Sequence, residues 1–569
     1  MVPQSEGVRP TPSTHRALVP VLLGLITLIG ALVRATGLGG AGLFYDDAWF
    51  ALPARVGVGT VLKMVVTTPG YTLLQSAWIS AGPAGNAWPK VLPFVLGVLA
   101  APAGYWLSRR CGLPRWVGLA IAGLLAASPA AIEYSVRVKE YEADLLLAVG
   151  VLAVAELVRR RGTAASIGAM VAVSIGAVLL STSLLVVVVG AWSALLMIAI
   201  AGRRRAVGLL VGAAITGAAC GLTALWVSSH IPDKLTAFWI QTHRLVGAPL
   251  TSSNLAHTLA LTPAGLLHGL VGMPLPTGRF PLTAQISDSA EVGLLVLAVA
   301  LLVLLALLVA PSLRAVVRRR VDDPALALLA PSMTMLVALL LWAVGTVPLG
   351  TGRTDLVLYP ALALLLGGGL VNVAERTRAS VASPTVRRRT GVVLAGAAVL
   401  LGAWMAWDQR SWYPGQDLAT LRHTMATSGD LRPGDVAVVV GRNSYTWAFD
   451  GLSPFVVHVD RNDPRARTVG FWVSFTDPRV LAVEPTQATA AAPSTNVIPG
   501  LAGLPASAHR LWVYATTNAT YSPSAYRLTG PLARAMTPTG VDPLLHRQGW
   551  TQQRRRVHAP GVVAVLYTR

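Results

Sequence analysis

The stretch ALVPVLLGLITLIGALVRA, residues 17–35, is an apolar run, and YDDAW follows it at residues 45–49. About 20 apolar residues in a helix cross the roughly 30 Å hydrocarbon core of a bilayer. The run lacks a small-residue cleavage site, so we interpret it as a retained helix and not as a removed signal. The adjacent carboxylates of Asp46 and Asp47 therefore lie just beyond the first predicted membrane helix.

The composition of the whole chain is that of a membrane protein. Its 569 residues are 54% hydrophobic and only 12% charged, with a mean hydropathy of +0.59. Soluble domains carry about 25% charged residues. The net charge of +21 could suit nucleic acid, but the arginines cluster beside apolar runs, which is the pattern of membrane orientation signals. The clusters are Arg109-Arg110, Arg159-Arg160-Arg161, Arg203-Arg204-Arg205, Arg318-Arg319-Arg320 and Arg387-Arg388-Arg389.

Further apolar runs predict about eleven transmembrane helices. They cover residues 17–36, 92–108, 116–132, 143–158, 165–181, 184–201, 206–227, 291–310, 327–345, 355–374 and 391–407. A turn is expected at Ser181-Thr182-Ser183. A cytoplasmic N-terminus, with residues 1–16 disordered, places every arginine cluster on the cytoplasmic side. The loops 37–91, 228–290 and 346–354 are then outside. The two cysteines, Cys111 and Cys220, indicate neither a disulfide framework nor a metal site.

The composition changes near residue 408, where charge becomes evenly spread. Short β-like runs occur at Val436–Val440, Arg510–Ala515 and Val562–Tyr567. Helices are expected at Asp417–Met425 and Asp542–Gln548, each behind an aspartate cap, and a loop at 486–499. The predicted fold class is an α-helical polytopic membrane protein, with a transmembrane domain over 17–407 and a C-terminal extracytoplasmic α/β domain over 408–569.

The first candidate site is the pair Asp46 and Asp47. Carboxylates so close to hydrocarbon are costly, and acidic residues at membrane depth point to function. Crowded carboxylates raise each other's proton affinity, which suits one of them to act as a base. The alternative is an N-cap pair that begins a helix at Ala48.

The second candidate site is the short, highly charged connection between the third and fourth spans, residues 128–144. A phosphate carried by a lipid needs a cationic partner at this depth, and Arg137 and Lys139 could supply it. The alternative is a solvated turn whose charges pair with one another.

A third candidate is Gly350–Pro360, where Arg353 could be another phosphate ligand unless it pairs only with Asp355. In the loop 228–290, the run Phe238-Trp239-Ile240 indicates a helix in the membrane interface. His230 and His243 in this loop are more often ordinary polar contacts than ligands.

These elements together resemble the GT-C superfamily of membrane glycosyltransferases, which includes protein O-mannosyltransferases, lipid A aminoarabinose transferase and actinobacterial arabinofuranosyltransferases. The resemblance covers roughly residues 17–375. It rests on Asp46-Asp47 in the first outer loop, on Ser128-Pro129, Tyr134-Ser135, Lys139 and Tyr141, and on Gly352-Arg353-Thr354-Asp355 with Tyr359-Pro360. Arg137 departs from the pattern, because relatives often carry an acidic residue there.

The resemblance implies a role for each matching residue. Asp46, with Asp47, would be catalytic, Asp46 as the general base that acts on the acceptor hydroxyl. Lys139, Arg137 and Arg353 would bind the donor phosphate. Substrate contacts are expected from Tyr45, Glu140, Tyr141, Asp355 and His243. No metal ligand is assigned, and a divalent cation stays an open alternative.

The implied activity is inverting sugar transfer from a polyprenyl-phosphate donor to a hydroxyl of a glycan or protein acceptor, outside the bacterial cytoplasmic membrane. Membrane lipid is the other expected partner, and nucleic acid is not. Scarce lysine with abundant alanine, valine, glycine and arginine is typical of a GC-rich, actinobacterial genome, so cell-envelope assembly is expected. One alternative is a transporter or flippase for a lipid-linked sugar, which needs charges near the middle of its spans. Another is a non-enzymatic membrane scaffold.

Overall fold

The computed structural model describes most of the chain. The described residues are 15–39, 42–43, 45–64, 69–83, 85–202, 206–231, 255–272, 288–320, 323–351, 353–380, 417–441, 443–460, 463, 470–483, 501, 504, 507–516, 538–559 and 561–569. Within them, the side chains of a few residues, including Tyr45 and Asp46, are not described.

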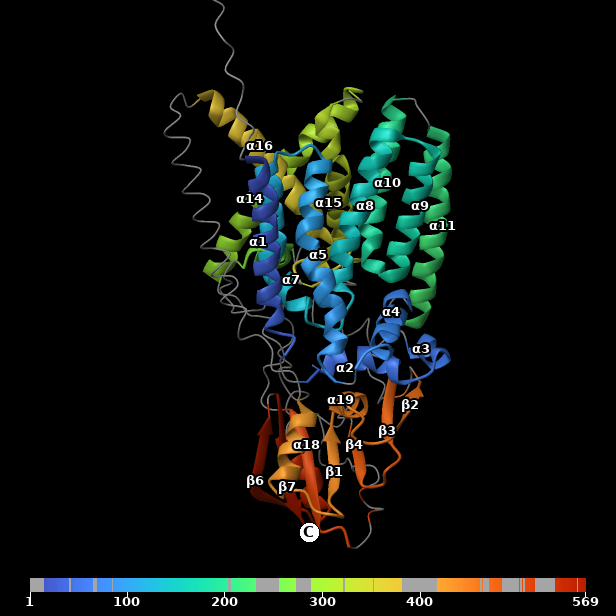
Figure 1. Cartoon of the computed structure of the whole chain (residues 1–569), viewed down its shortest axis with the longest axis vertical. Helices are drawn as coiled ribbons and strands as arrows, with labels where there is room; N and C mark the ends of the chain where they lie inside the picture. Colours follow the sequence, from blue (N-terminus) through green and yellow to red (C-terminus); the bar gives the residue numbers. More distant parts are fainter. Residues whose placement is uncertain are drawn as a thin grey trace, which may run out of the picture.

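Long helices run side by side in one bundle, with the β-strands at one end (Figure 1). The long helices are α1 (His15–Ala35), α5 (Trp88–Arg110), α6 (Arg115–Ala127), α8 (Tyr141–Arg161), α9 (Ala164–Leu180), α10 (Leu185–Gly202), α11 (Ala206–His230), α13 (Leu255–Val271), α14 (Asp288–Val317), α15 (Leu329–Ala343) and α16 (Tyr359–Ser380). The 3₁₀ turns η2 (Thr182–Leu184), η3 (Pro324–Leu328) and η4 (Thr354–Leu358) precede α10, α15 and α16.

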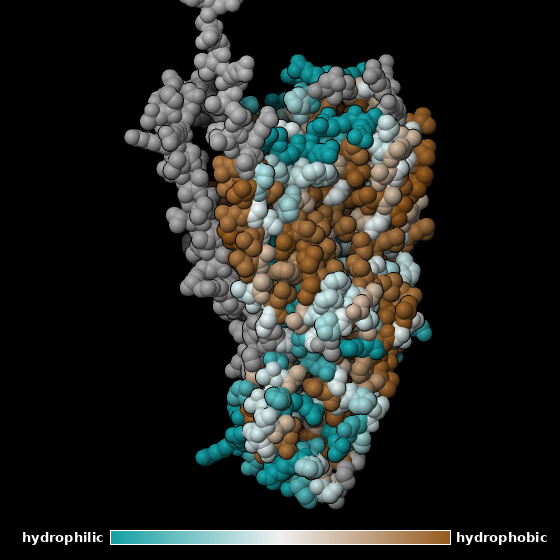
Figure 2. Space-filling model, in the orientation of Figure 1, coloured by the Kyte–Doolittle hydropathy of each residue, from teal (hydrophilic) through white to brown (hydrophobic). Residues whose placement is uncertain are grey.

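Seven helical segments in the described part of the chain are long and apolar enough to cross a membrane. They are α1, α5, η2 with α10, α11, α14, η3 with α15, and η4 with α16. On the face shown in Figure 2, apolar residues form a broad band across the middle of the bundle. Each predicted span coincides with a helix, except 116–132, which is broken at Ser128, and 391–407, which lies outside the described residues. The predicted turn at Ser181 is confirmed.

The two ends of the bundle differ in charge. We call the end where α5, α8 and α14 finish the arginine end, because Arg109-Arg110, Arg159–Arg161 and Arg318–Arg320 lie there. We call the opposite end the β-domain end. Within the bundle, glycine allows helices α10 and α15 to pack closely. A Cβ on Gly190 of α10 would lie 2.5 Å from the backbone nitrogen of Thr334 in α15.

The prediction of a continuous third span over 116–132 is wrong. Helix α6 ends at Ala127, and α7 (Pro129–Tyr134) begins after Ser128. Proline is well suited to the first position of a helix, and the Ser128 hydroxyl accepts a hydrogen bond from the Ala131 amide at 3.5 Å. The same hydroxyl donates to the Gly269 carbonyl at 2.9 Å, so the break is held by α13.

Short elements lie between the bundle and the strands (Figure 1). They are α2 (Tyr45–Ala51), η1 (Leu52–Arg55), α3 (Val58–Met64) and α4 (Pro69–Ser80). Sequence patterns missed these four helices, because each is too short to span a membrane. They also missed α13, an apolar helix of 17 residues inside the predicted outer loop 228–290.

The described part of the chain from residue 417 onward forms an α/β domain, here called the β domain. A five-stranded sheet has the order β4-β1-β5-β7-β6, with β1 parallel to both neighbours and β7 antiparallel to both of its own. A separate antiparallel ribbon joins β2 and β3. The strands are β1 (Val436–Val440), β2 (Phe455–Val459), β3 (Phe471–Phe475), β4 (Val480–Val483), β5 (Arg510–Thr516), β6 (Thr551–Ala559) and β7 (Val562–Thr568).

The sheet is covered on both faces, which explains the uninterrupted valines of β1. Alternate residues of a strand point to opposite faces. Val436, Val438 and Val440 pack with α22 (Pro538–Arg547), whereas Ala437 and Val439 pack with α18 (Leu418–Thr427). The predicted strands at β1, β5 and β7 and the Asp417 cap of α18 are confirmed. The predicted cap at Asp542 is wrong, because Asp542 lies inside α22.

The β domain is attached to the bundle through α2. Helix α19 (Asn443–Phe449) lies against α2 (Figure 1), and Tyr445 and Phe449 share an apolar cluster with Ala48 and Phe50. The Arg55 guanidinium lies 4.9 Å from the centre of the Phe449 ring. The predicted domain boundary at 408 and the predicted loop at 486–499 lie outside the described residues.

Candidate functional site

A buried ion pair joins the first candidate region to the second. The Arg137 Nε atom lies 2.6 Å from Asp47 Oδ2, and both residues are at most 5% exposed. Glu133 Oε1 lies 4.0 Å from Arg137 Nη1 on the same side of the loop. Residues 90 positions apart in the sequence therefore meet at the β-domain end of the bundle.

The loop that carries Arg137 is fixed by its own backbone. After α7 ends, the Arg137 amide donates to the Tyr134 carbonyl at 3.2 Å, and the Lys139 amide donates to the Arg137 carbonyl at 2.9 Å. Val138 is fully buried in the apolar cluster that also holds Ala48 of α2. The loop is thus packed onto the helix of the aspartate pair and is not the solvated turn of the alternative interpretation.

Lys139 extends the cationic side of the site. Its Nζ atom lies 4.1 Å from the centre of the Trp49 ring and 4.9 Å from that of Phe50. A cation over an aromatic face is stabilised electrostatically when water is excluded, and Lys139 is only 6% exposed. Tyr141, the first residue of α8, packs edge-on against Tyr134 at 4.8 Å between ring centres.

Lys90 is a further cation here that sequence patterns did not identify. It is the third residue of α5 and is 6% exposed. The charge of Asp47 attracts it and that of Arg137 repels it, so it lies in the same charged region. A single lysine before an apolar run looks like an ordinary end of a membrane helix. Its only signal was its position directly in front of the predicted span 92–108.

Carboxylates also gather around Tyr71 of α4. Burial raises the pKa of the Tyr71 hydroxyl well above its usual value, and the charges of Glu140 and Asp144 add to that effect. Tyr71 therefore stays protonated and can donate a hydrogen bond. Glu142 and Asp144, in the first turn of α8, are at most 1% exposed.

Arg353 and Asp355 lie on a loop that α13 supports. The Gly350 amide donates to Asp355 Oδ1 at 3.1 Å. Gly350 has φ +78° and lies against the Thr262 carbonyl of α13. The same helix receives the Ser128 hydroxyl bond, so it lies between this loop and α7.

Three predicted site residues cannot be placed in this geometry. The side chains of Tyr45 and Asp46 are not described, although both residues belong to α2. His243 and the predicted interfacial helix at 238–240 lie outside the described residues. Within the described part, no three His, Cys, Asp or Glu side chains converge as a metal site.

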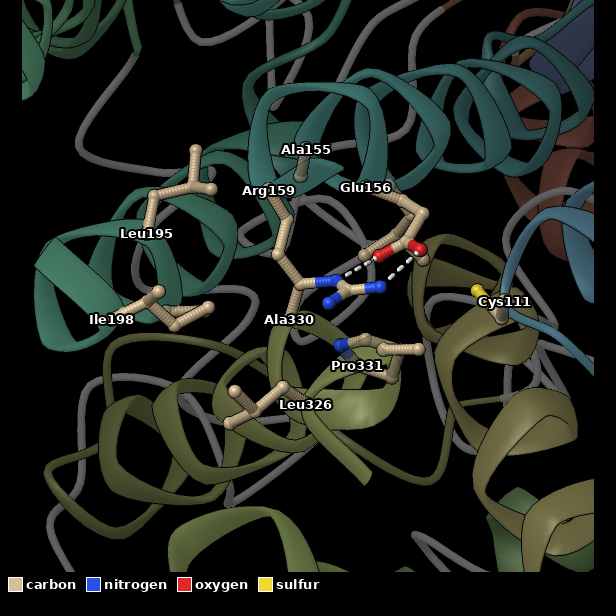
Figure 3. Close-up of a pocket in the computed structure, with 12 residues that line it drawn as sticks. Cys111, Ala155, Glu156, Arg159, Leu195, Ile198, Leu326, Ala330 and Pro331 are labelled. Atoms are coloured by element: carbon tan, nitrogen blue, oxygen red, sulfur yellow. Dashed lines mark hydrogen bonds and ion pairs between the residues drawn. The ribbon is translucent and has the colours of Figure 1, made fainter. Parts of the chain in front are cut away.

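A pocket at the arginine end is built differently. It is lined by apolar residues of α8, α10 and α15, together with Glu156 and Arg159 (Figure 3). Glu156 accepts hydrogen bonds from Arg159 at 2.6 and 2.8 Å and from Arg160 at 2.6 Å. These partners lie within one turn of the same helix, so the cluster is local.

The buried charges of the described bundle lie near helix ends and not at the middle of spans. Arg34 is in the last turn of α1, Lys90 in the first turn of α5, and Glu142 in the first turn of α8. Glu156 lies in the final turns of α8. A transporter pathway places charges at the middle of the membrane, so this distribution disfavours that alternative.

Comparisons with known proteins identify similar structures only. No protein-family model and no curated protein matches the sequence. The crystal structure of the apo oligosaccharyltransferase of Archaeoglobus fulgidus is 14% identical, with a TM-score of 0.41 over 75% of this chain, which spans 63% of that protein's length.

ArnT from Cupriavidus metallidurans is similar over nearly its full length. Its apo structure is 13% identical with a TM-score of 0.39, covering 97% of this chain and 98% of ArnT. Its structure bound to undecaprenyl phosphate is 14% identical with a TM-score of 0.40, covering 95% and 97%. Both neighbours are members of the GT-C superfamily. With identities of 13–14% and TM-scores of 0.39–0.41, the function proposed below rests on this chain's own residues.

Proposed function

We propose that the β-domain end of the bundle is the active site of an inverting membrane glycosyltransferase that uses a polyprenyl-phosphate sugar. The observation that carries this proposal is the buried contact between Asp47 and Arg137. Asp47 and Arg137 meet near Lys90 and Lys139, where the apolar helices end. A lipid phosphate has its charge at that depth and its chain in the hydrocarbon.

The cations have a clear chemical role in such a transfer. Arg137, Lys139 and Lys90 are all at most 6% exposed, so their charges are poorly screened by water. They would stabilise the charge that develops on the phosphate oxygen as the bond to the anomeric carbon breaks. A phosphate held in this way leaves without being protonated.

The acceptor hydroxyl needs a group that takes its proton. Asp47 is engaged by Arg137, so we assign the base to Asp46, its neighbour on α2. The acceptor oxygen attacks the anomeric carbon, its proton passes to Asp46, and polyprenyl phosphate departs on the opposite face. A single displacement of this kind inverts the anomeric configuration.

The β domain suggests where the acceptor arrives. It is attached to α2, the helix of the aspartate pair, through α19. We assign it to the extracytoplasmic side, because the arginine clusters mark the opposite end as cytoplasmic. An acceptor held by the β domain would therefore reach the site from outside, and a cell-envelope glycan fits this position.

The test is sugar transfer by membranes that contain the chain, supplied with polyprenyl-phosphate mannose or arabinofuranose radiolabelled in the sugar. We expect wild-type membranes to release labelled polyprenyl-free product, and Asp46→Asn to lose about 100-fold or more of the rate. Asp477→Asn is the matched control, because Asp477 is a partly exposed residue of the β domain paired with Arg479. Full activity of Asp46→Asn would contradict the assignment of the base.

A further inference from the structure

Arg34 is a completely buried arginine in the last turn of the first span. It is 1% exposed and reaches across to the end of α6. Its Nη1 atom donates to the Ala126 carbonyl at 2.6 Å, and its Nη2 atom donates to the Leu125 carbonyl at 3.1 Å. These carbonyls are free to accept because α6 stops at Ala127, so Arg34 caps the C-terminal end of α6.

The remaining nitrogen of the same guanidinium faces Glu142. A Cβ built on Gly97 would lie 3.2 Å from Arg34 Nε and 2.9 Å from Glu142 Oε2, so both atoms converge on the surface of this glycine. Among the described residues, neither Arg34 Nε nor either Glu142 oxygen has a hydrogen-bond partner. The two opposite charges attract each other, and no side chain at Gly97 separates them.

Arg34 therefore bonds the residues just before segment 128–141 and attracts Glu142 just after it. Leu125 and Ala126 precede residues 128–141, and Glu142 follows them. This segment carries Arg137 and Lys139. The next helix after α1, which supplies Arg34, is α2, which carries Asp47. Arg34 therefore belongs to the helix before α2 and bonds the end of the helix before segment 128–141.

We propose that Arg34 is a positioning residue, which holds both ends of segment 128–141 and so sets Arg137 against Asp47. Its role in transfer rests on the function proposed above, whereas the holding of the segment does not. Arg34 touches neither substrate nor reacting atoms in this assignment. Glu142 attracts Arg34 by its charge. Gly97 leaves room for the guanidinium, because it has no side chain.

The first test is amide hydrogen exchange of the purified chain in nanodiscs, which requires no substrate. We expect Arg34→Gln to speed exchange in peptides from 128–141 at least about tenfold and to leave the β domain unchanged. Arg34→Lys keeps the charge that attracts Glu142 but lacks the forked guanidinium that bonds both carbonyls, so an intermediate effect is expected. Arg160→Gln, which removes a surface arginine, is the control.

The second test is non-additivity with Arg137→Gln. We expect Arg34→Gln to lower kcat about tenfold in the wild-type background and less than about twofold in the Arg137→Gln background, because it acts through Arg137. Should Arg34→Gln not fold, Arg34→Lys and Gly97→Ala carry the same comparison. Unchanged exchange in 128–141 in a folded variant would overturn the proposal, and so would fully multiplicative rate effects. An inactive wild-type chain with faster exchange in Arg34→Gln would reject only the proposed function.

Discussion

Each end of helix α8 carries a buried glutamate, but the two glutamates differ in their hydrogen bonding. At the arginine end, Glu156 receives three short hydrogen bonds from Arg159 and Arg160, one turn away on the same helix. At the β-domain end, Glu142 is fully buried, and its oxygens have no hydrogen-bond partner among the described residues. The positive charge that acts on it, Arg34, comes from a different helix.

This difference distinguishes a local structural cluster from the cluster that we propose to be functional. A buried carboxylate with all its bonds made locally stabilises its helix end and is otherwise inert. A buried charge left without hydrogen bonds is costly, and proteins keep such groups chiefly where function requires them. The long-range pairs, Asp47 with Arg137 and Glu142 with Arg34, all lie at the β-domain end, which is where we place the chemistry.

The largest expected effect is at the ion pair of that end. Arg137→Gln breaks the buried ion pair with Asp47 and removes a proposed phosphate ligand, so we expect transfer to fall about 100-fold or more. Arg160→Gln breaks a pair of the same 2.6 Å length at the arginine end, and we expect its rate to stay within about twofold of wild type. Equal losses in the two variants, measured as kcat/KM at matched expression, would remove the distinction between the ends.

A second comparison uses glycines with positive φ. Gly350→Ala places a Cβ 2.7 Å from the Thr262 carbonyl at φ +78°, so we expect a cost of about 1–3 kcal/mol and a donor KM raised about tenfold as the Arg353 loop shifts. Gly434→Ala is the control, since its φ is +92° but no atom lies within 4 Å of the new Cβ. A thermal shift in Gly350→Ala with an unchanged KM would show that this loop is no part of the site.

Asp450 of the β domain interacts with Asn86 and Arg55, so it gives a pH-dependent test of how this domain is attached. Burial raises the pKa of Asp450 to about 7, with Asp417 raising it further and Asn86 and Arg55 opposing. Because the unfolded carboxyl titrates near pH 4, the folded protein binds the proton more tightly, and this stabilisation is lost as pH rises from about 4 to about 7. We expect Asp450→Asn to gain in Tm relative to wild type over that range and to keep a constant difference above it. A constant difference from pH 4 to 8 would contradict the assignment.

The smallest effect is expected at the arginine end itself. Glu156→Gln removes a carboxylate whose arginine partners are 16% and 47% exposed, so water can solvate them after the change. We expect stability to fall by no more than about 1 kcal/mol and transfer to stay within about twofold. Transfer would be measured in Glu142→Gln alongside. A large loss of transfer in Glu156→Gln would indicate that the active site lies at the arginine end, which contradicts our proposal.

Much of the fold could be predicted from local patterns. Long apolar runs marked the helices, and the valine-rich runs marked β1, β5 and β7, because hydrophobic burial acts on contiguous residues. The break at Ser128 was missed, since the apolar run continues through Ala130 and Ile132, and only the Ser-Pro pair signalled the cap. The start of α22 was misplaced because Asp542 looked like a cap, while the helix begins at Pro538.

The candidate site was only partly predictable. Asp47, Arg137 and Lys139 were singled out because charges beside apolar runs are unusual. Lys90 and Arg34 were not, because one basic residue at the end of a span is the ordinary pattern of a membrane helix. What distinguishes them is burial against residues distant in sequence, such as Arg34 against Ala126, and no local pattern encodes such a contact.

The central claim, that the cations of the β-domain end hold a lipid phosphate, is tested most directly by photocrosslinking. A photoreactive polyprenyl phosphate would be added to the chain in nanodiscs, and the labelled peptides would be identified by mass spectrometry. We predict labels in residues 85–96 and 128–144, which weaken in Arg137→Gln and Lys90→Gln. Labels confined to residues 106–116 and 156–161, at the arginine end, would contradict the account.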